Sequence, residues 1–312
     1  MNRQILNYFF VLLVSFSFSA EANASVSSAW AQWFEVGPSK YITQTYQSPD
    51  SEQNSERPSF IPYRVIFPPE FPKCSTSERC YKTVYFLHGR NGNAKMLEDL
   101  GVIEALNEIA KASQGPSFLI VLPEGGNNYW MNAAIERTGK SRWTNFVAEE
   151  LVKDVETRFP VMREPKARLL AGISMGGHGA LQIALNRPGI FGFVAAHSPV
   201  LRAVNNLEGL HDQFGTGADY EQRDPLSLIR RKGQIFFEGL WLDIGRGDFS
   251  YERTWEFANE LRARFDHHQL WIDNTSSDGH DLSYWKRRLP EYLGWYQQVL
   301  TKPSLRAPTK PF

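Results

Sequence analysis

Short apolar segments alternate with longer amphipathic segments along most of this chain, and this alternation limits its fold more than any other feature. The apolar segments are each short enough for one buried strand, and they lie at 81–89, 117–125, 167–174, 191–199, 240–245 and 268–274. Helical patterns lie between them, for example at 94–113, where leucine or isoleucine recurs every third residue. Buried strands that alternate with helices predict an α/β fold, with a mostly parallel central sheet and helices on both of its faces.

The flanking segments set the limits of the predicted domain. Residues 25–60 are polar and rich in turn formers, Phe60 begins a predicted strand that prolines end, and residues 301–312 contain too little apolar material to pack. We therefore expect one domain over residues 25–300, followed by a loose tail. The chain has 34 basic and 34 acidic residues, so its net charge gives no general attraction to nucleic acid or to an anionic membrane.

Residues 1–24 have the pattern of a secretory signal peptide. Arg3 precedes an apolar stretch from Ile5 to Ala20, and small residues follow up to Ala24. A membrane anchor is the alternative interpretation, but the apolar stretch is shorter than the roughly 20 residues that cross a bilayer. The sequence therefore predicts cleavage near Ala24 and export to the periplasm or the medium, with no membrane span left in the mature chain.

The chain contains two cysteines, Cys74 and Cys80, which lie close together just before an apolar strand. In an exported protein such a pair is more often bridged than free. The small ring would contribute about 2 kcal/mol to stability, which is enough to hold a loop but not to found a fold. Because no histidine lies near the pair, it is a poor zinc site.

The segment GISMGGHGAL, residues 172–181, places Ser174 between two glycines where an apolar strand ends and a helical pattern begins. This is the setting of a nucleophile elbow, in which a sharp turn exposes a reactive hydroxyl. Gly172 and Gly176 would bring no side chains into the crossing of strand and helix. The same turn aims the N–H group of Met175 at the place where an oxyanion would form.

A serine nucleophile needs a base, and in this architecture the partners follow in the order serine, acid, histidine. His280 comes after the last predicted strand, in a glycine-containing loop just before the final helix, and is therefore the predicted base. A surface histidine in a polar loop is the alternative interpretation. The other histidines stand before the serine, beside it, too soon after it, or at the start of a strand: His88, His178, His197, His211, His267 and His268.

Two carboxylates, five residues apart, compete for the role of the acid. Asp243 lies at the end of a predicted strand, whereas Asp248 lies in the loop beyond it. Loops after strand ends reach a catalytic histidine more readily, which favours Asp248, and Asp243 could equally be a structural residue.

The second oxyanion donor is expected in the loop after an early strand. The segment FLHGRNGN supplies this loop, because Gly89 allows a close backbone approach and the N–H of Arg90 follows it. A simple turn at His-Gly is the alternative interpretation.

Six motifs occur here in the order found in the esterase D family of α/β-hydrolases, which the chain resembles over most of residues 60–300. The motifs are YFLHGRNGN, VLPEGG, TNFVAEELVKDVETRF, AGISMGGHGALQIAL, LDIGRGD and DGHDLSYW. That family includes S-formylglutathione hydrolases, feruloyl and acetyl-xylan esterases, enterochelin esterases and mycobacterial mycolyltransferases. One departure is Glu124 in VLPEGG, where many members have aspartate.

The resemblance implies the α/β-hydrolase fold and a serine esterase without a metal or other cofactor. Carried over by motif, it implies Ser174 as the nucleophile, Asp248 as the acid of a Gly-x-x-Asp motif and His280 as the base. It also implies the backbone N–H groups of Arg90 and Met175 as the oxyanion donors.

Three of the nine tryptophans, Trp130, Trp143 and Trp285, lie near the predicted mouth of this site. They could form a stacking platform for sugars or aromatic acyl groups, although large aromatic side chains more often pack in the core. The sequence thus predicts an exported hydrolase that cleaves small or carbohydrate esters through an acyl-enzyme on Ser174. The alternatives are an acyltransferase with the same triad and a non-catalytic binding protein with the same fold.

Overall fold

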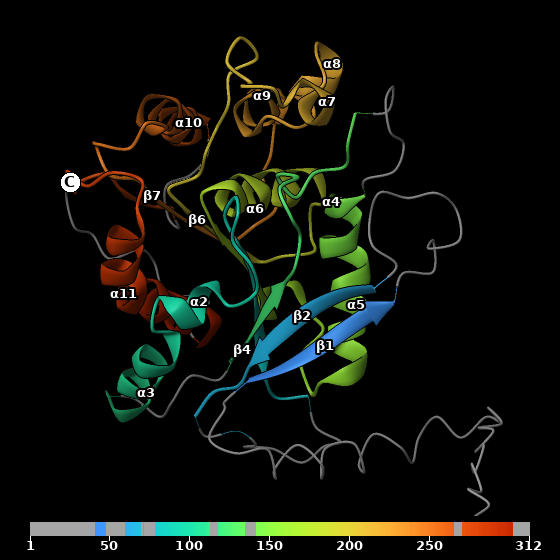
Figure 1. Cartoon of the computed structure of the whole chain (residues 1–312), viewed down its shortest axis with the longest axis vertical. Coiled ribbons are helices and arrows are strands. Elements are labelled where there is room, and N and C mark those ends of the chain that lie inside the picture. Colours follow the sequence, from blue (N-terminus) through green and yellow to red (C-terminus); the bar gives the residue numbers. More distant parts are fainter. Residues whose placement is uncertain are drawn as a thin grey trace, which may run out of the picture. The chain divides into compact units, whose positions relative to one another are not determined.

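The computed structural model describes residues 41–47, 60–69, 71, 79–112, 118–134, 142–264 and 270–301. Three sequence-based expectations therefore lie outside the described residues: the leader at 1–24, the tail after 301, and Cys74 as the partner of Cys80. Figure 1 shows the arrangement of the elements discussed below.

An eight-stranded sheet forms the centre of the described chain, in the order β1-β2-β4-β3-β5-β6-β7-β8. The pairings of β2 with β1 and with β4 are antiparallel, and all the others are parallel. The strands are β1 (Tyr41–Gln47), β2 (Phe60–Ile66), β3 (Lys82–Leu87), β4 (Phe118–Pro123), β5 (Arg168–Ile173), β6 (Phe193–His197), β7 (Gly239–Asp243) and β8 (Leu270–Asp273).

The expected mostly parallel sheet is confirmed, and every predicted strand lies within two or three residues of its expected ends. Strand β1 is not among the predicted strands, because the sequence predicts residues 25–60 to be irregular. Its sequence YITQTYQ carries mainly polar residues, and from Thr43 to Gln47 exposed and half-buried residues alternate. A strand at the edge of a sheet needs little apolar sequence, so composition alone did not reveal it.

The segment expected to form one helix over 94–113 forms two, α2 (Met96–Asp99) and α3 (Val102–Ala112). The chain turns at Gly101, whose φ of 90° lies in the left-handed region that favours glycine. The apolar spacing of three continues through the turn, which is why it suggested a single helix.

The motif TNFVAEELVKDVETRF forms a helical segment that begins at Trp143 and consists of three parts, α4 (Trp143–Asn145), the π-helical η2 (Phe146–Leu151) and α5 (Val152–Arg158). No side chain of the described chain caps the start of α4. The hydroxyl of Thr144 donates to the carbonyl of Trp130 at 3.2 Å, inside the protein.

The remaining helical segments complete the described chain. A short 3-10 turn, η3 (Pro165–Ala167), precedes β5. Three short helices lie between β6 and β7, where the sequence patterns predict none. The helices are α6 (Met175–Asn186), α7 (His211–Phe214), α8 (Ala218–Glu221), α9 (Pro225–Arg231), α10 (Tyr251–Arg264) and α11 (Leu282–Thr301).

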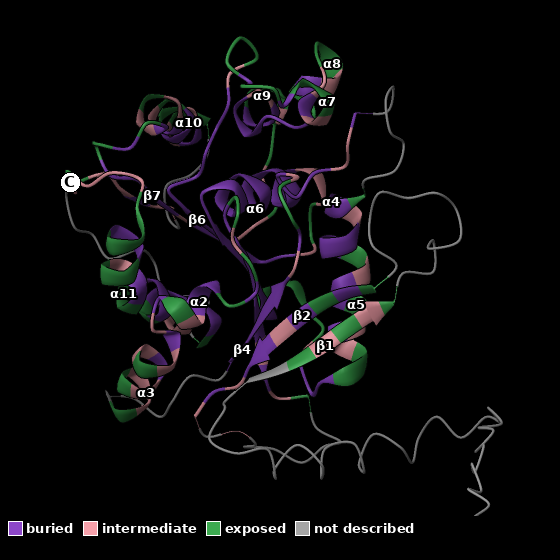
Figure 2. Ribbon diagram, viewed as in Figure 1, coloured by how far each residue is buried: buried purple, intermediate pink, exposed green. Residues whose placement is uncertain are grey.

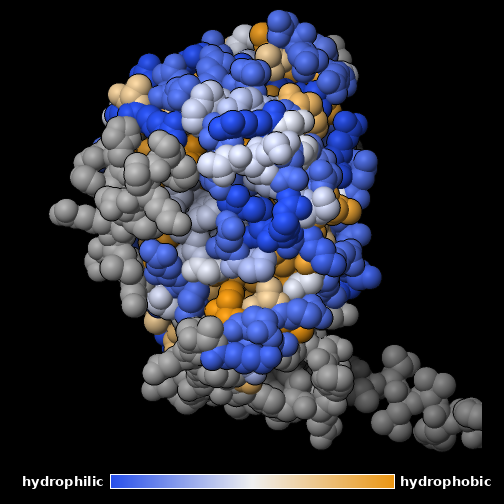
Figure 3. Space-filling model, turned by 90° about the vertical axis from the view of Figure 1, so that its left-hand side faces the viewer, coloured by the Kyte–Doolittle hydropathy of each residue, from blue (hydrophilic) through white to orange (hydrophobic). Residues whose placement is uncertain are grey.

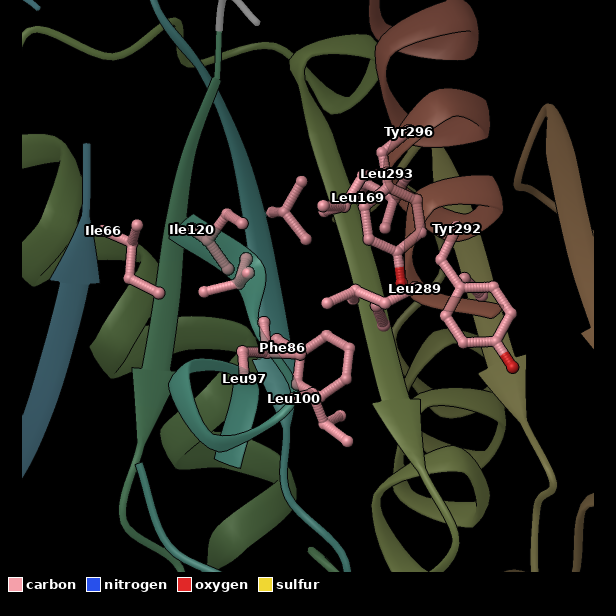
Figure 4. Packing of buried hydrophobic residues seen from close by; sticks show 14 of the residues in the cluster. Ile66, Phe86, Leu97, Leu100, Ile120, Leu169, Leu289, Tyr292, Leu293 and Tyr296 are labelled. Atoms are coloured by element: carbon pink, nitrogen blue, oxygen red, sulfur yellow. The ribbon is translucent and has the colours of Figure 1, made fainter. Parts of the chain in front are cut away.

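Helices cover both faces of the sheet, as expected. On one face α2, α3 and α11 pack against β3, β4 and β5, and Figure 4 shows side chains of this cluster. The labelled members are Ile66, Phe86, Leu97, Leu100, Ile120, Leu169, Leu289, Tyr292, Leu293 and Tyr296. On the other face lie α5 and α6, where Arg168 of β5 pairs with Glu156 of α5 at 2.5 Å.

Helix α6 is the most deeply placed helix of the fold, because all its residues from Met175 to Leu185 are buried. Figure 2 shows it in the buried colour together with the central strands. The face of the molecule in Figure 3 carries mainly hydrophilic residues, with hydrophobic ones in small separate groups. Among the described residues, no helix combines the length and the apolar character that crossing a membrane requires.

Candidate active site

Ser174 stands at the sharp turn between β5 and α6, with φ 60° and ψ −118°. Positive φ is strained for a residue with a side chain, and such strain concentrates at functional sites. The two glycines around it have no room for a side chain. A Cβ on Gly172 would lie 2.2 Å from the carbonyl oxygen of Gly176, and one on Gly176 would lie 2.0 Å from that of Leu87. The sequence pattern therefore reflects the close crossing of α6 over β5 and β3.

The structure brings Ser174, His280 and Asp248 together in one hydrogen-bonded chain. Nε2 of His280 lies 2.8 Å from Oγ of Ser174, and Nδ1 of the same ring lies 2.6 Å from Oδ2 of Asp248. An ionised carboxylate only accepts hydrogen bonds, so the ring proton lies on Nδ1 and Nε2 is free to accept the proton of the serine. The side chain of Asp248 is fully buried, and that of His280 is 15% exposed.

The loops that carry Asp248 and His280 are joined by their backbones. The N–H groups of Arg246 and Gly247 donate to the carbonyls of Ser276 and Asp278, at 2.8 and 3.0 Å. A Cβ on Gly245 would lie 2.1 Å from the carbonyl oxygen of Asp278, so a side chain there would separate the two loops. This close contact holds the carboxylate and the imidazole in register, although 32 residues separate them in the sequence.

Asp243, the other candidate acid, is bound elsewhere. It is fully buried, and its partners lie on three elements: His197 Nδ1 at 2.6 Å, Trp241 Nε1 at 2.7 Å, Tyr284 OH at 2.8 Å and Tyr292 OH at 2.7 Å. Burial by itself raises the pKa of this carboxyl, but His197, Arg288 and the hydrogen bonds outweigh burial and leave the pKa below its usual range. Asp243 therefore joins β6, β7 and α11 and has no contact with His280 among these bonds.

The two expected oxyanion donors lie beside the serine. Met175 is the first residue of α6, where the N–H groups have no partner within the helix. A Cβ on Gly89 would lie 3.2 Å from Cβ and 3.7 Å from Oγ of Ser174, so the backbone that leads into Arg90 runs directly against the serine. Backbone donors in this position can bind a negatively charged oxygen attached to the carbon that Ser174 attacks.

A pocket of about 520 Å³ opens over Ser174, and both apolar and polar residues line it. The apolar residues include Met96, Val200, Phe249, Leu282 and Trp285, and the polar ones include Arg90, Asn91, Asn93, Asp99 and Arg202. Phe249 and Leu282 are 67% and 61% exposed, and each stands within two residues of a member of the hydrogen-bonded chain. Neither residue could be assigned to the site from the sequence, because single exposed hydrophobic residues carry no signal without the fold.

The tryptophans expected to bind substrate divide between pocket and core. Trp285 lines the pocket, packs edge-on against His280 with ring centres 5.0 Å apart, and donates to Ser198 Oγ at 3.1 Å. Trp130 is fully buried, so the expectation that it stacks on a substrate is wrong. It packs edge-on against Trp143, which is also buried, with ring centres 5.9 Å apart. Trp130 has a φ of 56°, and it packs against Gly125 and Gly179, where an added Cβ would lie 2.3 and 2.8 Å from Trp130 atoms.

Glu124, the departure from the family motif, has a structural partner. Its Oε1 accepts the N–H of Ala94 at 2.9 Å and so ties the loop after β4 to the loop after β3. The carboxylate of Glu124 therefore holds the loop after β3, which also carries Arg90.

His178 lies one turn along α6 from Ser174, and it is fully buried between the rings of Tyr129 and Phe214. Burial lowers its pKa to about 4, and the nearby carboxylate of Asp224 opposes this shift only in part. A histidine with a lowered folded-state pKa costs stability as the pH falls, because the unfolded chain takes up its proton near pH 6.5 and the folded chain does not.

We therefore expect acid to destabilise the protein through His178. This residue alone should lower the free energy of unfolding by about 2 kcal/mol between pH 7.5 and pH 5. Denaturant titrations at both values should show a loss smaller by this amount in His178→Leu. His211→Leu, which changes an exposed histidine, is the control and should lose as much as the wild type. Equal losses in all three proteins would contradict the expectation.

Comparisons with known proteins agree with this geometry. The model of the family described as "Putative esterase" matches residues 59–296. An esterase of Mycobacterium tuberculosis is 30% identical over 178 residues, which are 57% of this chain and 36% of that protein, so the chain spans about a third of its length. An acetyl esterase of Caldicellulosiruptor saccharolyticus is 24% identical over 255 residues, which are 74% of this chain and 88% of that protein.

Solved structures share the fold. A ferulic acid esterase superposes with a TM-score of 0.67 at 20% identity, over 84% of this chain and 98% of that one. An S-formylglutathione hydrolase from Agrobacterium tumefaciens gives a TM-score of 0.67 at 20% identity, over 83% of this chain and 95% of that one. Both similarities support the α/β serine hydrolase fold.

Proposed function

The chain belongs to the esterase family whose model it matches over residues 59–296, and from this premise we propose that it hydrolyses carboxylic esters through an acyl-enzyme on Ser174. The observation that carries the proposal is the continuous chain of hydrogen bonds from Ser174 Oγ through His280 to Asp248, at 2.8 and 2.6 Å. A strained serine with a neutral imidazole at hydrogen-bonding distance is a nucleophile with its base in place.

In the first half of the proposed reaction, Ser174 Oγ attacks the ester carbonyl carbon while Nε2 of His280 takes the serine proton. Asp248 stabilises the imidazolium that forms, and the N–H groups of Arg90 and Met175 bind the oxyanion. The carbon–oxygen bond of the ester then breaks, and His280 returns its proton to the departing alcohol. Water repeats the sequence on the acyl-enzyme, releasing the acid and restoring Ser174.

The proposed substrate is a small ester, including esters of carbohydrates. A pocket of about 520 Å³ lies within the range of small-molecule sites. Its lining combines the apolar Phe249, Leu282 and Trp285 with the polar Asn91 and Asn93, which suits an ester with one apolar and one polar part. The names of the relatives, acetyl esterase and ferulic acid esterase, lie within this class.

The test is a hydrolysis screen on the mature protein. It compares p-nitrophenyl esters of increasing acyl length with methyl ferulate and acetylated sugars, and a fluorophosphonate probe reports on Ser174 by peptide mass spectrometry. Hydrolysis together with labelling at Ser174 supports the proposal. Transfer of the acyl group to an added alcohol in preference to water would identify an acyltransferase. The absence of both hydrolysis and labelling would identify a binding protein.

Export and a Cys74–Cys80 bridge complete the proposal, and both rest on the sequence of the leader and the spacing of the cysteines. We expect mature material from an exporting host to begin near Ser25 and to weigh two hydrogens less than the reduced chain. Intact-mass measurement before and after reduction checks both points. A retained leader would contradict export, and two free thiols in exported protein would contradict the bridge.

A further inference from the structure

His88 lies between the last residue of β3 and Gly89. It is 1% exposed, and it does not belong to the residues that line the pocket. The ring has a hydrogen bond at each nitrogen. Nε2 accepts the N–H of Gly125 at 3.1 Å, and Nδ1 lies 2.8 Å from the carbonyl oxygen of Gly89. A nitrogen that accepts from an amide carries no proton, so the ring proton lies on Nδ1 and is donated to the Gly89 carbonyl.

That carbonyl belongs to the same peptide unit as the N–H of Arg90. A trans peptide is planar, and its C=O and N–H point in opposite directions. Fixing the direction of the Gly89 oxygen therefore fixes the direction of the Arg90 N–H. The N–H of Gly92 also donates to the Gly89 oxygen, at 3.0 Å, so two donors fix the direction of this carbonyl.

The surroundings hold the ring of His88 itself. Trp130 Nε1 donates to the His88 carbonyl at 3.2 Å, and the two rings pack edge-on with centres 5.0 Å apart. Burial lowers the pKa of His88, although its bond to the Gly89 carbonyl and the charge of Glu124 oppose the shift. The neutral ring is the form that the contacts require, because a protonated Nε2 would point its hydrogen at the N–H of Gly125.

We propose that His88 is a positioning residue for ester hydrolysis, whose Nδ1–H holds the Gly89–Arg90 peptide so that the Arg90 N–H faces the oxyanion on the Ser174 adduct. This inference rests on the proposed function. It explains why a buried histidine precedes Gly89, and it gives the buried Trp130 a role in supporting the oxyanion site from the loop after β4.

Two amide substitutions separate positioning from simple packing. In His88→Asn, the side-chain NH₂ reaches the place of Nδ1 and can still donate to the Gly89 carbonyl. In His88→Gln, the amide reaches the place of Nε2, where its oxygen can accept from Gly125, but no donor faces Gly89. The two variants differ by one methylene group and lose the same ring.

The assay is hydrolysis of p-nitrophenyl acetate, with turnover expressed per serine titrated to completion by a fluorophosphonate, so that unfolded protein does not contribute. We expect His88→Asn to keep kcat within about threefold of the wild type, and His88→Gln to lower kcat by about 10²-fold with KM nearly unchanged, because one oxyanion donor is misdirected. The rate of fluorophosphonate labelling should follow the same order, since its adduct uses the same donors.

Equal kcat values and labelling rates in the two variants would overturn the proposal, whatever their melting temperatures, because the ring would then act by packing alone. Wild-type protein that is labelled but does not hydrolyse the ester would refute the proposed function, and the labelling rates of the variants would still test the role of His88.

Discussion

Replacing Ser174 by alanine should lower kcat for ester hydrolysis by roughly 10⁴ to 10⁶, a loss that leaves turnover near the background rate. In the proposed mechanism the oxygen of this hydroxyl forms the acyl-enzyme, and Ser174 supplies the hydroxyl that is hydrogen-bonded to Nε2 of His280. His280→Ala should cost about as much, and the double variant should lose no more than either single one, because nucleophile and base act as a unit.

The fold should survive Ser174→Ala. The substitution removes one oxygen from a side chain whose only partner given by the structure is His280, and alanine tolerates φ of 60° no worse than serine. The melting temperature and the circular dichroism spectrum are therefore expected to match those of the wild type. Turnover by Ser174→Ala within tenfold of the wild type would remove this serine from the mechanism.

Asp248→Asn should lower kcat by roughly 10² to 10⁴ while the melting temperature changes little. The carboxylate accepts Nδ1–H of His280 at 2.6 Å, and an asparagine amide can turn its NH₂ toward the same nitrogen. The ring proton would then move to Nε2. This nitrogen would point its own proton at the serine and could no longer accept the serine proton. The charge that stabilises the imidazolium is lost as well. Steady-state kinetics with p-nitrophenyl acetate give the measurement.

Asp243→Asn is the matched comparison, because it makes the same chemical change five residues away in the sequence. Asp243 is a buried charge bonded to His197, Tyr284 and Tyr292, so its loss should lower the free energy of unfolding by about 3 to 5 kcal/mol. Folded protein should keep most of its turnover. The opposite pattern, with activity lost in Asp243→Asn and retained in Asp248→Asn, would reverse the assignment of the acid.

The contrast between the two aspartates also explains the arrangement around the base. Asp243 ties α11 to the sheet through Tyr284 and Tyr292, and α11 carries Trp285, which packs against the ring of His280. One carboxylate thus bonds directly to the imidazole, and the other holds the helix beside it. Asp243 is the last residue of β7, and Asp248 lies in the loop that follows this strand.

Local pattern was enough to predict most of the fold and several members of the site. Strands β2 to β8 could be predicted from short apolar runs, because burial in a parallel sheet requires apolar side chains at neighbouring positions. The turn at Ser174 could be predicted from its flanking glycines, because a close strand–helix crossing leaves no room for side chains there. His280 could be predicted from its place after the last strand, because chain order in this architecture limits which loops reach the serine.

Other features depended on contacts between distant segments. Sequence patterns left Asp243 and Asp248 as rivals, and only the pairing of the 245–248 loop with the 276–278 loop decides which carboxylate meets the imidazole. Sequence patterns also left Trp130 between a stacking platform and core packing, and its burial depends on distant segments, because it packs against Gly179 of α6 and donates to the carbonyl of His88. A side chain's direction at the end of a strand is set by what packs across from it, and residues that are far apart in the chain supply that packing.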